Sequence, residues 1–201
     1  MKLFYSPTSP YVRKVSVIAE LTGMAAKIER VVPDFSPIKI APELMAKNPL
    51  GKIPVLVLDD GLVLYDSTVI CQYLDDLAGT GLYPRAGRLR WLVLRAEALA
   101  DGLMDAAVLM RYETALRPAD KQWGEWRDGQ LRKVNHALAE MESELGSRPR
   151  FDAGHGATAV ALGYLRLRTP DMGWEKSHPK LAAWFSEVDE RPEFSTTRPV
   201  G

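Results

Sequence analysis

A short segment rich in glycine and proline, residues 79–87 (GTGLYPRAG), divides the chain into two parts with different patterns. Before it, strand-like runs alternate with helical patterns. After it, the strand patterns disappear and apolar residues recur at helical spacing. Clusters of glycine and proline mark turns and linkers. The sequence therefore predicts two domains, residues 1–78 and 88–201, joined by a linker over 79–87.

The first part predicts a small mixed sheet covered by helices. The expected order is β-α-β-α-β-β-α, with strands at 2–5, 26–32, 55–58 and 62–64 and helices at 11–21, 37–46 and 67–77. The Asp60-Gly61 pair between the last two strands is a strong hairpin signal. Ser67 is expected to cap the third helix. Alternating strands and helices indicate an α/β domain.

The second part predicts an all-helical domain. Leu92, Ala96, Leu99 and Leu103 follow one helical stripe, which predicts a long helix over 89–115. Apolar residues between 131 and 145 recur at alternating threes and fours, the spacing of a packed helix. Two further helices are expected at 157–167 and 180–190. The expected fold class is therefore α/β followed by all-α.

Composition argues against several classes of function. Lysine plus arginine and aspartate plus glutamate each number 26, so the formal net charge is zero. A chain without excess basic charge offers no broad surface for nucleic acid or for an anionic membrane. No run approaches the roughly 20 apolar residues that cross a bilayer, and the N-terminus predicts a strand rather than a signal peptide.

The single cysteine, Cys71, excludes an internal disulfide and any CxxC pair. Its apolar neighbours predict a small core residue rather than a nucleophile. Cysteine usage of this kind predicts a reducing, cytoplasmic setting. The three histidines, His136, His155 and His178, lack the spacing of metal ligands, so no metal is expected.

Ser9 and Pro10 form a strong helix start, with serine at the N-cap and proline at the first helical position. The helix follows the first strand, and small α/β domains bind ligands at the carboxyl ends of their strands. Two explanations stay open on these residues alone. Ser9 either caps the helix and does nothing else, or its hydroxyl also contacts a ligand.

The same turn resembles a redox motif. Ser9-Pro10-Tyr11 is similar to the start of the Cys-Pro-Tyr-Cys motif of glutaredoxins, with serine in place of the nucleophilic cysteine. A serine cannot exchange disulfides, but its hydroxyl can donate a hydrogen bond to the thiolate of a bound thiol. A thioredoxin-like domain with this substitution, followed by a helical domain, resembles the glutathione transferase superfamily.

Other segments carry the resemblance in the same order along nearly the whole chain. Residues 48–56 (NPLGKIPVL) resemble the family's loop into the third strand, which carries a cis-proline, and residues 65–67 (YDS) resemble its Glu/Asp-Ser glutathione motif. Residues 178–181 (HPKL), Trp184 and residues 191–194 (RPEF) are similar to the family's closing helix. The first helix and residues 100–105 (ADGLMD) look most like a bacterial, serine-type branch.

The resemblance implies a role for each candidate residue. Ser9 donates to the glutathione thiolate, and the rivals for this role are Thr8, Ser6 and Tyr5. Pro54 in its cis form leaves the Ile53 backbone free to pair with the tripeptide. Asp66 receives the amine and Ser67 the γ-glutamyl carboxylate, at a helix start that favours anions. The candidates for the glycyl carboxylate are Lys52 and, more weakly, Lys39 and Asn48.

The second substrate is expected in a pocket of the helical domain. Methionine and aromatic stripes on helices are more often core than pocket, so each candidate has a structural alternative. The candidates are Leu103, Met104, Met110, Arg111, Tyr112, Tyr164 and Trp174.

The resemblance implies a glutathione transferase that conjugates the glutathione thiolate to small, mainly apolar electrophiles in detoxification, as a cytoplasmic homodimer. Glutathione is then a co-substrate. A glutathione-dependent isomerase, peroxidase or dehalogenase would begin with the same thiolate, and a non-catalytic partner-binding protein would share the fold. A disulfide reductase is disfavoured because it needs cysteine at position 9.

One departure concerns the central helix of the second domain. The family starts this helix with a Ser/Thr cap and an aspartate three residues on, whereas this chain has Asp152-Ala153-Gly154-His155. The sequence therefore predicts that the capping box is missing, with Asp152 as a partial substitute.

Overall fold

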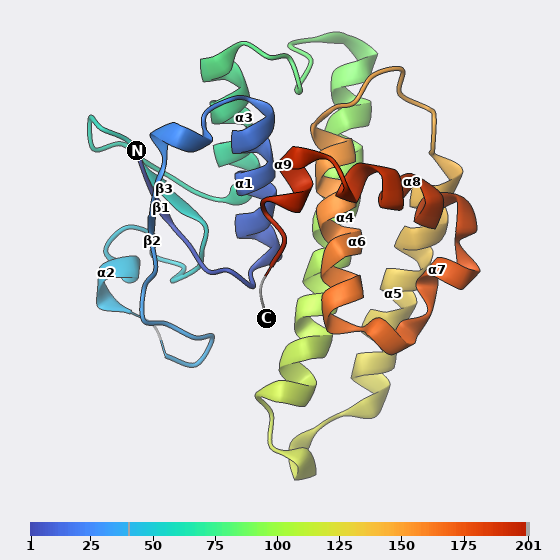
Figure 1. The fold of residues 1–201 in the computed structure, drawn as a ribbon. Helices are drawn as coiled ribbons and strands as arrows, with labels where there is room; N and C mark the ends of the chain where they lie inside the picture. Colours follow the sequence, from blue (N-terminus) through green and yellow to red (C-terminus); the bar gives the residue numbers. More distant parts are fainter. Residues whose placement is uncertain (40, 200–201) are drawn as a thin grey trace. The chain divides into compact units, whose positions relative to one another are not determined.

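The computed structural model describes residues 1–39 and 41–199 (Figure 1). Chain contacts divide these residues into two compact units, one formed by 1–83 with 192–199 and the other by Pro84–Arg191. The division falls inside the segment expected to be a linker. The C-terminal segment differs from expectation, because the sequence placed all of 88–201 in the second domain.

The first unit contains a four-stranded sheet in the order β2-β1-β3-β4. β1 (Lys2–Phe4) runs parallel to β2 (Glu29–Val31) and antiparallel to β3 (Val55–Val57), which pairs antiparallel with β4 (Val63–Leu64). The expected hairpin thus forms. The strand expected at 26–32 is shorter, because η1 (Ala25–Lys27) occupies its start.

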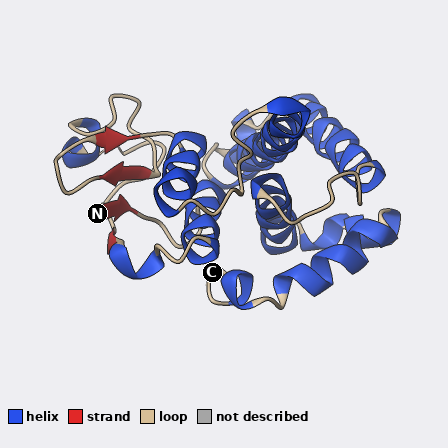
Figure 2. Ribbon diagram, turned by 90° about the horizontal axis from the view of Figure 1, so that it is seen from above, coloured by secondary structure: helices blue, strands red, loops and turns tan. Residues whose placement is uncertain are grey.

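Helices cover both faces of this sheet (Figures 1 and 2). Phe4 and Val55 pack with Leu44 of α2 (Pro42–Met45) on one face. Because strand side chains alternate, Leu3 and Leu56 point to the other face, where α1 (Pro10–Leu21) packs with α3 (Ser67–Ala78) and α3 contacts β3. The helix expected at 37–46 is reduced to α2, and Ile40 lies outside the described residues.

The C-terminal helix completes the first unit. α9 (Pro192–Ser195) contacts α1, and the Arg13 guanidinium donates a hydrogen bond to the Phe194 carbonyl at 3.3 Å. Both residues are buried. This packing connects segments 181 residues apart, so local sequence patterns could not indicate it.

Among the described residues of the second unit, every regular element is a helix. They are α4 (Gly87–Ala115), η2 (Ala119–Lys121), α5 (Gly124–Ser143), α6 (Ala153–Arg168), η3 (Pro170–Met172), α7 (Trp174–Ser177) and α8 (Pro179–Asp189). α4 packs against both α5 and α6, and α4 and α6 run in the same direction (Figure 1). The α/β plus all-α fold class is confirmed.

The capping box of α6, expected to be missing, is present. The Asp152 carboxylate accepts from the His155 backbone N–H at 3.0 Å, and His155 Nδ1 lies 3.3 Å from the Asp152 backbone N–H. The expectation was wrong because histidine replaces the usual glutamate or glutamine at the third helical position. His155 also stacks on Phe151 and lies tilted against Trp184, which fixes its ring.

Candidate functional site

Three segments of the first unit meet at one end of the strands of the sheet. Phe4 pairs with Val55, so the chain leaving β1 lies beside the chain entering β3. Leu56 pairs with Leu64, so the chain leaving β4 lies on the other side of β3 at the same end of the sheet. Ser9, Ile53-Pro54 and Asp66-Ser67 all belong to these segments. The register therefore brings the predicted site residues to one end of the sheet.

Ser9 is the N-cap of α1, as the sequence predicts. Its Oγ accepts from the Val12 backbone N–H at 3.4 Å, and Pro10 occupies the first helical position. Accepting this bond uses an oxygen lone pair and leaves the hydroxyl hydrogen available. Among residues 1–39 and 41–199, no acceptor takes that hydrogen. The half-buried hydroxyl thus lies at the positive end of a 12-residue helix with a hydrogen bond still to donate.

The rivals of Ser9 lie between the end of β1 and the start of α1. The Tyr5 ring lies under the Arg30 guanidinium, 4.9 Å from its centre, and the Tyr5 backbone N–H donates to the Val31 carbonyl. Thr8 is half-buried and precedes the cap. Unlike Ser9, neither side chain is at the helix N-cap.

The loop before β3 is organised by Asn48. Its side-chain amide donates to the Lys52 carbonyl at 2.9 Å, and its oxygen accepts from the Leu50 N–H at 3.0 Å. Asn48 is buried and both ends of its amide are used, so it shapes the loop. Lys52 is exposed, and the Ile53-Pro54 bond that follows is cis, as the resemblance implied.

Asp66 and Ser67 form the start of α3, but Asp66 is the cap. Its carboxylate accepts from the Thr68 N–H at 3.1 Å, and Ser67 occupies the first helical position. The prediction of a serine cap was therefore wrong by one residue. Ser67 is buried, and its hydroxyl has no hydrogen-bond partner among the described residues. The Tyr65-Asp66 bond is also cis.

Lys14, which the sequence analysis did not single out, joins the two helix starts. Its side chain is 1% exposed, and its Nζ donates to Thr68 Oγ1 at 3.2 Å. A buried ammonium near the starts of α1 and α3 adds positive charge there. Its place in an apolar helical run offered no signal beyond the charge itself.

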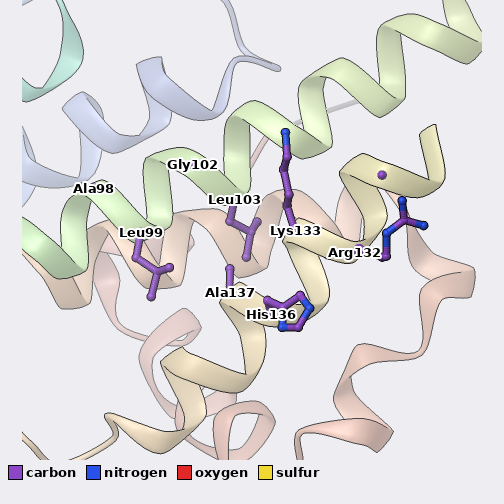
Figure 3. A pocket seen from close by; sticks show the side chains of 9 residues that line it. Ala98, Leu99, Gly102, Leu103, Arg132, Lys133, His136 and Ala137 are labelled. Atoms are coloured by element: carbon purple, nitrogen blue, oxygen red, sulfur yellow. The ribbon is translucent and has the colours of Figure 1, made fainter. Parts of the chain in front are cut away.

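Of the candidates for the second-substrate pocket, several are core residues. Met104 and Trp174 are fully buried, and the Trp174 ring lies 6.1 Å from that of Phe185. Leu103 lines a groove between α4 and α5 together with the α5 residues Arg132, Lys133 and His136. Figure 3 shows Leu99 and Leu103 pointing toward Ala137 and His136 across this groove of about 650 Å³. None of the predicted glutathione residues lines it.

The remaining candidates gather near the ends of α4 and α6. Arg111 and Tyr112 lie on α4, and Tyr164 and Arg168 lie one turn apart on α6; we call these four residues the arginine–tyrosine cluster. Burial raises the pKa of the Tyr164 hydroxyl. The charges of Arg168 and Arg111 lower this pKa in part, and Tyr112 raises it further. Arg168 was not predicted, although its spacing from Tyr164 could have indicated it.

No group of three or more His, Cys, Asp or Glu side chains is placed to hold a metal ion in the described part of the chain. None of the helices described is both long and apolar enough to cross a membrane.

This chain is similar to known glutathione S-transferases in both of its parts. The glutathione S-transferase N-terminal domain profile matches residues 8–77, and the C-terminal domain profile matches residues 124–187. A glutathione transferase family member from Pseudomonas fluorescens Pf-5, solved with bound glutathione, is 48% identical with a TM-score of 0.94, covering 100% of this chain and 99% of that one. The chain belongs to the glutathione transferase superfamily.

Other relatives in the superfamily are similar over their full length. The uncharacterized GST-like protein YibF of Escherichia coli (strain K12) is 34% identical over 99% of this chain and 98% of its own. A glutathione S-transferase from Methylobacillus flagellatus, solved with glutathione bound, is 39% identical with a TM-score of 0.89, covering 99% of each chain.

Proposed function

We propose that this member of the glutathione transferase superfamily conjugates the glutathione thiolate to small electrophiles. The observation that carries the proposal is the Ser9 hydroxyl, which caps α1 and still has a hydrogen to donate. A bound thiolate beside this hydroxyl would be stabilised by both the hydrogen bond and the helix N-terminus.

The energies of these two interactions are sufficient. A free thiol has a pKa of about 8.5, and lowering it by about two units needs roughly 2.7 kcal/mol in favour of the thiolate. A hydrogen bond to a charged group contributes about 1.5–3 kcal/mol. A helix N-terminus adds about 0.3–1 kcal/mol. Ser9 therefore needs no separate general base.

The remaining predicted residues would hold the tripeptide. Asp66 offers a carboxylate for the amine, the Ser67 hydroxyl and backbone offer donors for the γ-glutamyl carboxylate, and Ile53 offers its backbone beside cis-Pro54. Lys52 would attract the glycyl carboxylate. Glutathione in the 48% identical relative supports this assignment. The same protein, in a structure 47% identical to this chain, was solved with S-(propanoic acid)-glutathione, in which the sulfur is substituted.

A cytoplasmic homodimer is part of the proposal. Cys71, the single cysteine, forms no disulfide within the chain and is buried, which suits a reducing compartment. Each unit leaves large apolar side chains exposed: Leu62 and Leu77 in the first, and Trp91, 68% exposed, in the second. Light scattering of the purified protein measures the mass, which should be twice 22.4 kDa.

Retention on immobilised glutathione followed by an assay with 1-chloro-2,4-dinitrobenzene tests the proposed activity. We expect retention, elution by free glutathione, and formation of the thioether. Retention without turnover of a broad electrophile panel, including haloalkanes, peroxides and isomerisable substrates, would overturn the enzyme proposal.

That second outcome would favour a non-catalytic role. Elongation factor 1-gamma of Danio rerio is 23% identical to this chain, which spans 42% of its length, so the superfamily fold also occurs in proteins not named as transferases. The donor at Ser9 argues for turnover in this chain, because partner binding alone does not require it.

A further inference from the structure

The arginine–tyrosine cluster lies where α4 and α6 come together near their C-terminal ends. Gly154 near the start of α6 lies against Val93 and Ala96 of α4. The two helices run in the same direction (Figure 1), so both rise about 1.5 Å per residue away from that contact. Residues near the end of α6 therefore reach the level of the last turns of α4. The mutual influence of Tyr164, Arg168, Tyr112 and Arg111 agrees with this placement.

The two arginines of the cluster have no counter-ion in the described chain. Across residues 1–39 and 41–199, no carboxylate lies within 4 Å of the guanidinium of Arg111 or Arg168. The neighbouring Arg166 differs, because it is near both Glu175 and Asp189. The Arg168 Nε is buried and has no acceptor there. A buried guanidinium donor without an acceptor is costly unless a ligand supplies one.

The tyrosines add donors to this positive charge. Tyr164 is 6% exposed, and burial keeps the pKa of its hydroxyl above the ordinary value of 10.0. Burial likewise raises the pKa of the Tyr112 hydroxyl. Both hydroxyls therefore stay protonated at neutral pH and can donate. Two guanidinium groups and two hydroxyls present donors with no competing carboxylate within the cluster.

We propose that the arginine–tyrosine cluster binds a carboxylate group of the second substrate, so that the enzyme prefers electrophiles that carry a carboxylate over neutral ones. A guanidinium matches the two oxygens of a carboxylate in a planar, bidentate fashion. This inference rests on the proposed conjugation and adds the substrate class. It differs from the sequence-based expectation of mainly apolar electrophiles, which stays a prediction.

A matched pair of electrophiles tests the preference. In 4-chloro-3,5-dinitrobenzoate, the thiolate sulfur bonds to the carbon that bears chlorine, chloride leaves with the pair of the broken C–Cl bond, and the thiol proton goes to solvent. The corresponding benzamide reacts identically but is neutral. We expect wild type to turn over the benzoate with the higher kcat/KM, after each value is divided by the uncatalysed rate constant.

Variants identify the cluster as the source. Arg111→Gln and Arg168→Gln are each expected to lower the benzoate-to-benzamide ratio of kcat/KM about tenfold or more. Arg168→Lys should restore part of it, and Tyr164→Phe should lower it a few-fold. Arg150→Gln is the control, because this exposed arginine precedes α6, at the opposite end from Arg168. An unchanged ratio in both arginine variants would overturn the proposal.

Calorimetric binding of 3,5-dinitrobenzoate, which has no leaving group, separates this inference from the proposed function. Tighter binding to wild type than to Arg168→Gln, without turnover of either electrophile, would retain the carboxylate site and refute the transferase. Turnover of both electrophiles, with equal dinitrobenzoate affinity in wild type and variants, would retain the transferase and refute the carboxylate site. Circular dichroism of each variant confirms that it is folded.

Discussion

At the scale of single residues, Ser9 shows that capping a helix and assisting chemistry are compatible. The Val12 N–H donates a hydrogen bond to the Ser9 oxygen, and the hydroxyl hydrogen of Ser9 remains available to donate. The cap position also places this hydrogen at the positive end of α1. A residue chosen only as a cap would not need a hydroxyl, because asparagine or aspartate caps equally well.

Ser9→Ala is expected to raise the pKa of the glutathione thiol in the complex by about one to two units, which corresponds to a lost charge-assisted hydrogen bond. Glutathione should still bind, because the other contacts remain. Thiolate absorbance near 240 nm, titrated with pH, measures the shift. Ser9→Gly is the matched control for the cap, since glycine costs a helix start only a few tenths of a kcal/mol. An unchanged titration in both variants would transfer the role to Thr8, Tyr5 or backbone groups.

Asp66→Asn is expected to weaken glutathione binding about tenfold. Asparagine keeps the cap of α3 but loses the charge proposed to hold the amine. Calorimetry measures the affinity and thermal unfolding checks that the cap is intact. Asp60→Asn is the control, because Asp60 is an exposed turn residue whose oxygen accepts from Leu62. Equal affinities for wild type and Asp66→Asn would remove Asp66 from the site.

At the scale of elements, the sequence predicted most helices because their signals are local. Pro10 and Ser9 mark the start of α1, and the apolar stripe of α4 predicts a helix of nearly the observed length. Two helix starts were assigned wrongly although their contacts are local, because residue type alone does not show which side chain bonds the free N–H groups of a helix start. Asp66 rather than Ser67 caps α3, and a histidine completes the capping box of α6.

The candidate site was predictable only in part, because burial and contacts between distant segments are not visible in a linear pattern. The motif residues near Pro54 and Asp66 stand out in the sequence, and strand register explains why they meet. Lys14 was missed because burial of a charge is not visible in a linear pattern, whereas Arg168 follows Tyr164 by four residues, a spacing that could have indicated it. The packing of α9 on α1 likewise depends on residues distant in sequence.

The contact between α4 and α6 depends on a glycine. A Cβ at Gly154 would lie 2.8 Å from the Ala96 Cβ and 3.1 Å from the Val93 carbonyl oxygen. Gly154→Ala is therefore expected to destabilise the protein by about 1–3 kcal/mol through overpacking. Gly102→Ala, with open space at an exposed position of α4, should instead be neutral or stabilising by up to about 1 kcal/mol.

Denaturant unfolding of the two alanine variants measures both changes. Identical substitutions with opposite signs would attribute the loss to the helix contact, because the intrinsic preference of alanine for helix is the same in both. Two stabilising substitutions would show that α6 shifts away from α4 without cost.

At the scale of the whole molecule, two carboxyls of the second unit link its stability to pH. Burial would raise the pKa of the Asp152 carboxyl, but the hydrogen bond and charge of His155, the charge of Arg148 and the His155 N–H together lower it below 3.8. Desolvation likewise raises the pKa of the Glu142 carboxyl. The hydrogen bonds from the Leu181 and Lys180 N–H groups and from His178 outweigh this effect, so the pKa of Glu142 falls below 4.5. Glu142 of α5 accepts from the backbone N–H groups of Lys180 and Leu181 at the start of α8, and Asp152 caps the start of α6.

A lowered folded-state pKa stabilises the fold above the unfolded pKa, and this stability is lost as pH falls through the folded value. Acid is therefore expected to weaken the second unit below about pH 4 to 5. The chain allows the units to be observed separately, because all five tryptophans lie between residues 84 and 191 and the one cysteine, Cys71, is buried in the first unit.

Between pH 7 and pH 3, the denaturant midpoint measured by tryptophan fluorescence should fall more than the midpoint for reaction of Cys71 with 4,4′-dithiodipyridine, a thiol reagent that works in acid. The double variant Asp152→Asn, Glu142→Gln keeps oxygen acceptors at both caps but cannot lose a charge. Its fluorescence midpoint should therefore vary less with pH, at the cost of lower stability at pH 7.

If both probes shift equally in wild type and the double variant keeps the full pH dependence, these two carboxyls are not the source of the acid sensitivity. If the probes diverge and the variant removes the divergence, the two units differ in acid stability because of these two caps.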